Sequence, residues 1–366
     1  MQSVIIGSGW HVPLFSIEVS TLLNLPEDIF QGLGTRFIQL ETPNFLLDSL
    51  STAATVDDIY SPGKSISFSQ DESMKDLRSK FANWLSKTQL DKTGQTVAVR
   101  AIRIGAKKEG WSSSQLAGIF GGVLADNSWE INLSNPSIEI GLVIDTVNSK
   151  IAWGVKHFQK TPRQGWAKRT PTQRPFFKPI SMDPRHAILM ANLVKGQGTI
   201  IDPMAGTGGF LVEASFAGLS AIGVDVDEEM VRGAKLNLDW ARELGATGKV
   251  SVIEGNSTCL SAILPKEYEP YSGIVFDPPY GRNSQGTEAP VALFQKILTS
   301  SREVVTKNSN LACLLPCDPN DSNIVHGMAW QDIEEVFSAS DWKVLGKWVL
   351  PVHASLGRLL VLAKAV

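Results

Sequence analysis

Residues 198–214, which read GTIIDPMAGTGGFLVEA, decide the fold of this chain of 366 residues. A short apolar run is followed by a cluster of glycines and then by residues that favour a helix, which predicts a strand, a turn and a helix of a parallel α/β sheet. A phosphate loop would need a lysine after the glycines, and a dinucleotide-binding turn would need a glycine where Leu211 stands. Both phosphate interpretations are therefore weak, although the glycines still let the backbone pass close to a ligand.

Polar residues end the two apolar runs that follow. Asp225 closes the run 221–224, nineteen residues after Gly206, where a carboxylate can accept hydrogen bonds from ribose hydroxyls. Asn256 follows the run 250–254 and could present its amide to an adenine edge. Either residue alone is weak support, but their combination with the glycine turn predicts a cofactor that contains adenosine.

A second signal stands at residues 277–280, Asp-Pro-Pro-Tyr, directly after the apolar run 271–276. Two prolines fix φ and remove two backbone donors, so the Asp277 carboxylate and the Pro278 carbonyl can both act as acceptors beside the ring of Tyr280. Such a set suits the exocyclic amine of a planar base. The tetrapeptide alone is equally well interpreted as an ordinary turn, because Asp and Pro favour turns. Together with the upstream signals it indicates four successive strand ends of a doubly wound sheet, where such folds bind ligands.

These residues resemble the S-adenosylmethionine-dependent class I methyltransferases, in the group that methylates amines. More narrowly, the chain is similar to the archaeal tRNA guanosine-10 N2-methyltransferases, closely over about residues 172–366 and loosely before them. The resemblance implies an α/β fold: a C-terminal Rossmann-like class I methyltransferase domain, with a doubly wound sheet and an antiparallel last strand, preceded by α+β ferredoxin-like and THUMP domains. The segments that carry the likeness are 174–184, 192–193, 202–214, 223–238 and 277–282.

The resemblance also implies a role for each candidate site residue. Asp277 and the carbonyl of Pro278 would bind the two amine hydrogens of the base, and Asp277 or water would take the proton. Tyr280 would stack on the base, and Pro279 would stiffen the loop. The cofactor S-adenosylmethionine would be held by Asp202, Ala205, Gly206, Thr207 and Gly208 at its methionine part, by Asp225 at its ribose, and by Val226 and Asn256 at its adenine. At Asn256 many relatives have an aspartate.

The length of the chain suits two or three domains. Residues 1–71 are interpreted as a ferredoxin-like lead-in domain, and residues 72–155 resemble a THUMP RNA-binding domain in the order of their helices and strands. Residues 156–180 form a basic linker that contains several prolines, and residues 181–366 hold the methyltransferase domain. Without that methyltransferase, the second segment would be interpreted as an ordinary small α+β domain. Its expected elements are helical stretches at 72–85 and 113–124 and a central strand at 96–104.

The net charge of −3 argues against indiscriminate nucleic-acid binding, but the charge is unevenly distributed. No acidic residue occurs between Asp145 and Asp183, whereas eight lysines and arginines do, with Trp153 and Trp166 among them. A basic tract with stacking groups could follow an RNA backbone, although a linker whose lysines only keep it soluble would look the same. The candidate RNA-binding residues are Lys107, Lys108, Lys156, Lys160, Arg163, Lys168, Arg169 and Arg174.

Composition bears on metals, membranes and partners. Three cysteines are too few for a disulfide framework, and Cys313 and Cys317 lie in an apolar run and at its exit, which predicts buried thiols and no metal site. No run of 18 or more apolar residues and no secretory signal occurs, so we expect a cytoplasmic protein that does not bind membranes. The expected cofactor is S-adenosylmethionine and the expected partner is tRNA, while the need for a small activator subunit stays open.

The expected function is that of a tRNA guanosine N2-methyltransferase, which transfers one or two methyl groups from S-adenosylmethionine to the exocyclic amine of guanosine 10. Three alternatives stay open. The target could be another guanosine of tRNA or rRNA, or an amine of DNA or protein, which motifs of this kind also serve. The chain could also be a non-catalytic RNA-binding protein, although the intact Gly206, Asp225 and Asp277 argue against that.

Overall fold

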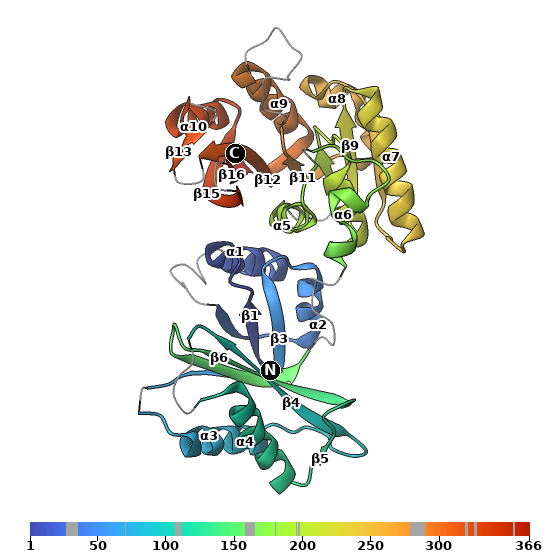
Figure 1. The fold of residues 1–366 in the computed structure, drawn as a ribbon. Helices are drawn as coiled ribbons and strands as arrows, with labels where there is room; N and C mark the ends of the chain where they lie inside the picture. Colours follow the sequence, from blue (N-terminus) through green and yellow to red (C-terminus); the bar gives the residue numbers. More distant parts are fainter. Residues whose placement is uncertain are drawn as a thin grey trace. The chain divides into compact units, whose positions relative to one another are not determined.

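The chain folds into two compact units in the computed structural model (Figure 1). One unit consists of residues 1–16, 30–51 and 55–162, and the other of residues 17–29, 52–54 and 163–366. The structure describes residues 1–26, 36–69, 71–106, 111–157, 165–179, 181–194, 196, 198–278, 290–318, 321–325, 328–353 and 356–366.

The first unit contains a sheet of seven described strands. They are β1 (Gln2–Gly7), β2 (Phe37–Glu41), β3 (Val56–Ser67), β4 (Thr96–Ile104), β5 (Glu130–Ile131), β6 (Ile138–Asp145) and β7 (Lys150–Lys156). Their order in the sheet is β2-β1-β3-β7-β6-β4-β5, and β4 is parallel to β5 and β6 while the other neighbours are antiparallel. Strands from both sides of residue 71 therefore share one sheet, and the division expected there between two domains stays a prediction.

Two helices, α3 and α4, pack on this sheet, at the helical stretches that the sequence predicts at 72–85 and 113–124. The helices before residue 157 are α1 (Val12–Leu23), α2 (Asn44–Leu47), the 3₁₀ helix Asp48–Thr52, α3 (Met74–Lys87) and α4 (Ser113–Asp126). α3 and α4 each begin with a capping box, at Ser73 and Ser112, which satisfies backbone donors of the first turn. Their apolar faces meet at Phe81 and Phe120, whose ring centroids lie 4.1 Å apart beside the buried Trp153 of β7.

The second unit contains the doubly wound sheet with an antiparallel last strand, which confirms the expected fold class. Its strands are β8 (Thr199–Asp202), β9 (Ser220–Asp225), β10 (Val250–Glu254), β11 (Tyr271–Phe276), β12 (Val305–Asp318), β13 (Asp321–Val325), β14 (Met328–Ala329), β15 (Trp342–His353) and β16 (Leu356–Ala365). The strands β10-β9-β8-β11-β12 run parallel, β16 pairs antiparallel with both β12 and β15, and β13 pairs with the end of β12.

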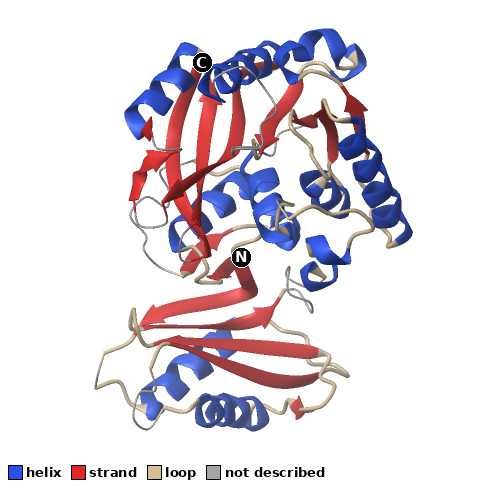
Figure 2. Cartoon of the chain, turned by 45° about the horizontal axis from the view of Figure 1, so that its top comes forward, coloured by secondary structure: helices blue, strands red, loops and turns tan. Residues whose placement is uncertain are grey.

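Helices cover both faces of this second sheet (Figure 2). They are α5 (Pro184–Val194), α6 (Gly209–Phe216), α7 (Glu228–Glu243), α8 (Leu260–Ile263), α9 (Pro290–Val304) and α10 (Trp330–Ala339). Short 3₁₀ helices occur at Trp166–Lys168, Pro171–Gln173, Ser257–Cys259 and Lys266–Tyr268. The core between sheet and helices includes Phe294 and Phe337, whose rings meet edge to face. Because the parallel strands all end at one edge of the sheet, the loops that follow them are gathered there.

The described residues also bear on the expectations about cysteines, metals and membranes. Cys313 and Cys317 are buried, which confirms that prediction, whereas Cys259 is exposed. Within the described ranges, no three His, Cys, Asp or Glu side chains are grouped so that they could hold a metal ion. No helix within those ranges is long and apolar enough to cross a membrane.

Candidate active site

The glycine turn between β8 and α6 forms one side of the candidate site. Asp202 ends β8 in a buried position, where its Oδ1 accepts a hydrogen bond of 3.1 Å from the backbone N–H of Met204. Gly206 and Gly208 have φ values of 51° and 74°, in the left-handed region that side-chain-bearing residues rarely adopt. A Cβ atom on Gly206 would meet no described atom within 4 Å. This face of the turn is therefore open, and a bound molecule can approach the backbone directly.

Asp225, at the end of β9, is tied to the same turn. Its Oδ2 accepts a 2.7 Å hydrogen bond from the backbone N–H of Gly206, and its Oδ1 accepts one of 3.0 Å from Asp227. Burial raises the pKa of the Asp225 carboxyl, although these backbone donors act in the opposite direction. The neighbouring Val226 exposes 75% of its surface. Its apolar side chain can therefore pack against a flat ring, next to the Asp225 carboxylate, which can accept hydrogen bonds from hydroxyls.

Asn256 follows β10 and lies exposed. Its Oδ1 accepts hydrogen bonds from the backbone N–H and the hydroxyl of Thr258, at 3.0 and 2.9 Å. The side-chain amide nitrogen of Asn256 has no hydrogen-bond partner among the described residues. Because the oxygen is engaged, the nitrogen is the group that can donate to a ring nitrogen of adenine.

Asp277 follows β11, and its side chain is only 14% exposed. Its Oδ1 is buried and has no hydrogen-bond partner within the described part of the chain, although Nη1 of Arg358 lies 3.4 Å away as an ion pair. Burial raises the pKa of Asp277 to about 6, against the lowering effect of the Arg358 cation. Pro278 is buried beside it, whereas Pro279 and Tyr280 lie outside the described residues.

Three carboxylates end neighbouring strands, since β9, β8 and β11 are adjacent in the sheet. Burial raises the pKa of Asp202 well above its usual range, and the nearby charges of Asp225 and Asp277 raise it further. Such a group of acids disfavours phosphates and favours a cationic ligand. The sulfonium and ammonium groups of S-adenosylmethionine are cationic, and the exposed Val226 and the open face at Gly206 suit its adenosine and methionine parts. The residues present therefore fit this cofactor.

The segment before α5 is fastened to the glycine turn by Asn237 of α7. Its Oδ1 accepts a 2.9 Å hydrogen bond from the N–H of Phe176, and its Nδ2 donates to the carbonyls of Phe176 and Thr207 at 2.7 and 2.8 Å. The Thr207 hydroxyl also lies 3.0 Å from the hydroxyl of Ser181. Thr207 therefore connects the turn to the preceding segment, which is a structural task in addition to the cofactor role that the sequence suggests.

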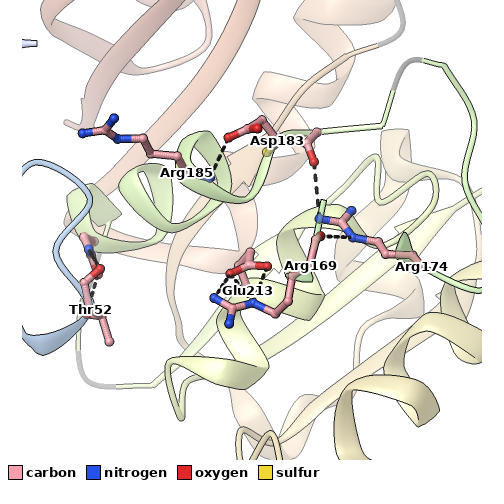
Figure 3. A network of polar contacts seen from close by, with 8 residues as sticks. Thr52, Arg169, Arg174, Asp183, Arg185 and Glu213 are labelled. Carbon is pink, nitrogen blue, oxygen red and sulfur yellow. Dashed lines mark hydrogen bonds and ion pairs between the residues drawn. The ribbon is translucent and has the colours of Figure 1, made fainter. Parts of the chain in front are cut away.

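A buried ion pair fastens the segment around Arg169 and Arg174 to α6 (Figure 3). Glu213 of α6 is 1% exposed and accepts three hydrogen bonds from the Arg169 guanidinium, at 2.8 to 3.1 Å. Arg174 is 4% exposed, and its Nε donates a 3.0 Å hydrogen bond to the Arg169 carbonyl. The sequence suggested RNA contact for both arginines. Their guanidinium groups are instead engaged inside the unit, because a buried carboxylate and a backbone carbonyl accept their hydrogen bonds.

Comparison with known proteins agrees with this geometry. A family described as "RMKL-like, methyltransferase domain" matches residues 171–344. The tRNA (guanine(10)-N2)-dimethyltransferase of Pyrococcus abyssi is 30% identical over 247 residues, 68% of each chain. A protein of that name from Methanocaldococcus jannaschii is 32% identical over 189 residues, 51% of this chain and 52% of its own. This chain belongs to the tRNA (guanine(10)-N2)-dimethyltransferase family.

The fold of this family member is also found in a solved structure. TrmN from Thermus thermophilus superposes over 100% of both chains with a TM-score of 0.51 and 14% identity, a likeness of fold. Family membership, the strand order and the fit of the strand-end residues together identify the chain as an S-adenosylmethionine-dependent methyltransferase.

Of the other six candidate RNA-binding residues of this methyltransferase, two lie within the described residues. Lys156 of β7 forms ion pairs with Asp58 and Glu139, at 3.3 and 3.5 Å. Lys168 is exposed and has no ion-pair partner among the described residues. The remaining four, Lys107, Lys108, Lys160 and Arg163, lie outside the described residues.

The first unit also contains a basic cleft that was not predicted from the sequence. Its volume is about 920 Å³, and α3 contributes Lys80, Trp84 and Lys87 to its lining, while β3 contributes Lys64 and β7 contributes Trp153. The indole nitrogen of Trp153 is buried and has no hydrogen-bond partner within the described part of the chain. The signal in the sequence is the spacing i, i+4, i+7 of the three α3 residues, which puts two cations and an aromatic ring on one helix face.

Proposed function

We propose that this enzyme methylates the N2 amine of guanosine 10 in tRNA. The observation that carries the proposal is the carboxylate of Asp277, which ends β11 next to the cofactor-binding strand ends with a buried Oδ1 that has no hydrogen-bond partner among the described residues. An unpartnered buried acceptor is costly, so a ligand donor is its natural partner. We take this donor to be the N2 amine of guanosine 10, because the curated members of the family are guanine-10 N2-dimethyltransferases.

The chemistry requires acceptors more than it requires a strong base. The lone pair of a guanine N2 amine is delocalised into the ring, so the nitrogen becomes nucleophilic only when its hydrogens are held out of the ring plane. Asp277 and the carbonyl of Pro278 are proposed to accept these two hydrogens and to orient the nitrogen. Bound S-adenosylmethionine supplies an electrophilic methyl group at its sulfonium. The amine proton is released to Asp277 or to water.

The acceptor role sets the ionisation state that Asp277 needs. A carboxylate accepts from an amine, whereas a protonated carboxyl group can itself donate. Burial raises the pKa of Asp277 to about 6. The carboxyl is therefore mostly ionised at neutral pH, but its pKa lies only about one unit below that pH. We propose that Tyr280 stacks on the base that has left the RNA stack, and that Pro279 stiffens the loop.

Dimethylation is the proposed extent of the reaction. After one transfer, the N2 amine keeps one hydrogen, for which a single acceptor is sufficient. The names of the Pyrococcus and Methanocaldococcus relatives both specify dimethylation. We therefore propose N2,N2-dimethylguanosine as the final product and N2-methylguanosine as the intermediate.

The same proposal assigns RNA binding to the first unit. We propose that residues 72–155 form a THUMP domain behind a lead-in domain at 1–71, and that the cleft lined by Lys64, Lys87 and Trp84 contacts RNA. With a net charge of −3, local cations have to supply the attraction to phosphates. The exposed Lys168, in the proposed linker 156–180, can add to it. The proposed methyltransferase domain is 181–366, and the enzyme is proposed to act on tRNA in the cytoplasm.

The test is transfer of tritiated methyl groups from S-adenosylmethionine to an unmodified tRNA transcript, followed by nucleoside analysis. We expect label in N2-methylguanosine and N2,N2-dimethylguanosine, and none in a transcript with adenosine at position 10. Methylation by the chain alone would show that no activator subunit is required. Label in another nucleoside, or undiminished label in the substituted transcript, would refute guanosine 10 as the target.

RNA binding by the cleft is tested separately. In the double variant Lys64→Ala/Lys87→Ala, we expect the Kd for tRNA to rise and the dependence of log Kd on log salt concentration to become shallower by about one to two charges. The control variant Lys75→Ala/Lys92→Ala removes two exposed lysines of the same unit that do not line the cleft. Equal weakening in both variants would contradict a specific role for the cleft.

A further inference from the structure

Arg358 of β16 reaches the candidate catalytic carboxylate from a distant part of the sequence. In the sheet, Arg358 lies opposite Pro316 of β12, and β12 pairs in parallel with β11, where Phe276 lies opposite Cys313. This register brings Arg358 to the edge at which β11 ends. Its Nη1 lies 3.4 Å from Oδ1 of Asp277, and its side chain is 21% exposed.

The contact is an ion pair without a hydrogen bond. Oδ1 of Asp277 stays without a hydrogen-bond partner among the described residues, although the guanidinium is its neighbour. A bidentate pair would have engaged both carboxylate oxygens with N–H groups and taken the lone pairs that a substrate amine needs. A single approach at 3.4 Å stabilises the negative charge and leaves the oxygen able to accept.

Among the described groups that face Asp277, Arg358 is the one that carries a positive charge. From β8 the facing group is Asp202, and from β12 it is Cys313, whose thiol is held neutral because burial raises its pKa well above the usual range. On α5, His186 is a neighbour of Arg358, and burial together with the charges of Arg185 and Arg358 lowers the pKa of its ring, against the effect of Asp183, which favours the neutral form. The surroundings of Asp277 are otherwise buried or acidic, and both conditions favour its protonation.

We propose that Arg358 is a positioning residue for methyl transfer, which keeps the Asp277 carboxylate ionised and correctly oriented while leaving its Oδ1 available to the substrate amine. The proposal rests on the proposed function, because that function makes Asp277 the acceptor. The electrostatic effect of Arg358 on Asp277 can be tested separately from that function, since it exists whether or not tRNA is bound.

The expected consequence is a dependence on pH that a purely structural role would not produce. Removing the cation raises the pKa of Asp277 by about 1–3 units. In Arg358→Gln, kcat/KM should therefore fall about 5-fold or more near pH 6 and recover towards the wild-type value near pH 9. Arg358→Lys keeps the charge and should show a smaller displacement of the profile. A loss through misfolding or poor packing would be similar at every pH.

The first experiment compares pH profiles of kcat/KM for tRNA methylation between pH 5.5 and 9.5. Lys364→Gln, which removes a cation from the far end of β16, is the matched control and should retain the wild-type profile. The Kd for S-adenosylmethionine and the melting temperature check that each variant is folded. An acid limb at the same pH in Arg358→Gln as in the wild type, or an equal loss at every pH, would overturn the proposal.

A second experiment needs no RNA substrate. The carboxyl carbons of aspartate are labelled with ¹³C, and their NMR signals are followed as a function of pH; the signal that disappears in Asp277→Asn belongs to Asp277. We expect it to titrate near pH 6 in the wild type and at higher pH in Arg358→Gln. Titration at an unchanged pH would refute the proposal. If the wild type does not methylate tRNA but this signal moves as expected, the proposed function has failed while the electrostatic role of Arg358 holds.

Discussion

The backbone N–H of Gly206 donates a 2.7 Å hydrogen bond to Oδ2 of Asp225. The acid that ends one strand thereby holds the glycine turn that follows the neighbouring strand. Because the other oxygen accepts from Asp227, both oxygens of the carboxylate are oriented before any ligand arrives. The turn and the candidate ribose-binding residue form one preorganised unit, so a change in either should affect the other.

Loss of the Asp225 carboxylate should weaken cofactor binding. In Asp225→Ala, we expect the Kd for S-adenosylmethionine to rise about 10- to 100-fold, because a hydrogen bond to a charged group contributes about 1.5–3 kcal/mol. Isothermal titration calorimetry measures this Kd. The control is Asp227→Ala, which removes the N-cap of α7 and should cost about 1 kcal/mol of stability with little effect on the Kd. Equal weakening in the two variants would argue against a specific role for Asp225.

A side chain at Gly206 should interfere with the ligand and not only with the fold. Gly206 and Gly245 both have positive φ, 51° and 89°, and a Cβ on either would meet no described atom within 4 Å. Alanine at each position should therefore cost about 1–2 kcal/mol of stability through the same backbone strain. Only Gly206→Ala should also raise the Kd for S-adenosylmethionine about 10-fold or more. If both variants bind the cofactor normally, the open face of the turn is not where it lies.

Methyl transfer should have an acid limb near pH 6. The pKa of Asp277 is raised on folding from an ordinary 3.8 to about 6, and the acceptor role requires the ionised form, so kcat/KM should fall about tenfold per pH unit below that value. Asp277→Asn keeps a carbonyl acceptor and should lose the limb while retaining partial activity. Asp277→Ala has no acceptor and should be inactive at every pH. A profile that is flat down to pH 5 in the wild type would exclude Asp277 as the ionising group.

The same shift affects stability in the opposite direction. A carboxyl whose pKa is raised on folding contributes stability that is fully present below about pH 3.8 and is lost as the pH rises through 6. Asp277→Asn should therefore gain stability relative to the wild type above pH 6, by on the order of 1–3 kcal/mol. Urea denaturation at pH 5 and pH 8 measures the difference. A stability difference that does not change between the two pH values would show that Asp277 ionises normally.

The buried pair of Glu213 and Arg169 should be far more sensitive to mutation than an exposed pair. Glu213→Ala leaves Arg169 and the nearby Arg174 without their carboxylate, and should cost about 3 kcal/mol or more. Glu228→Ala removes an exposed i,i+4 pair with Arg232 and should cost less than about 1 kcal/mol. Urea denaturation followed by tryptophan fluorescence compares them. Similar midpoints for both variants would mean that the buried pair contributes little.

Local sequence signals predicted the strand ends that form the candidate site. The apolar runs 250–254 and 271–276 correspond to β10 and β11 without a shift of a residue at either end. The glycine turn lies between β8 and α6 as expected, with Gly206 and Gly208 in the conformations that glycine permits. These features were predictable because each depends on residues a few positions apart: turns on glycine and proline, strands on short apolar runs.

Charge patterns were a weaker guide, because charge alone does not reveal where a side chain lies. Arg169 and Arg174 stand in a tract without acidic residues, which suggested a solvated, RNA-facing linker. Their partner Glu213 lies about forty residues further on, in α6, the helix that follows the glycine turn. Folding brings Glu213 against the two arginines. Similarly, Lys64 of β3 and Lys87 of α3 line one cleft only because the two elements pack together.

By itself, then, the sequence determined the class of fold, the glycine turn, the polar strand ends and the candidate acceptor at Asp277, since backbone preferences and apolar periodicity act over short distances. Only the tertiary structure decided that β16 pairs with β12, which brings Arg358 to Asp277. It also decided that the Asp277 carboxyl is buried enough for its pKa to rise to about 6. Strand pairing and desolvation depend on segments that are remote in the chain, so no local pattern can encode them.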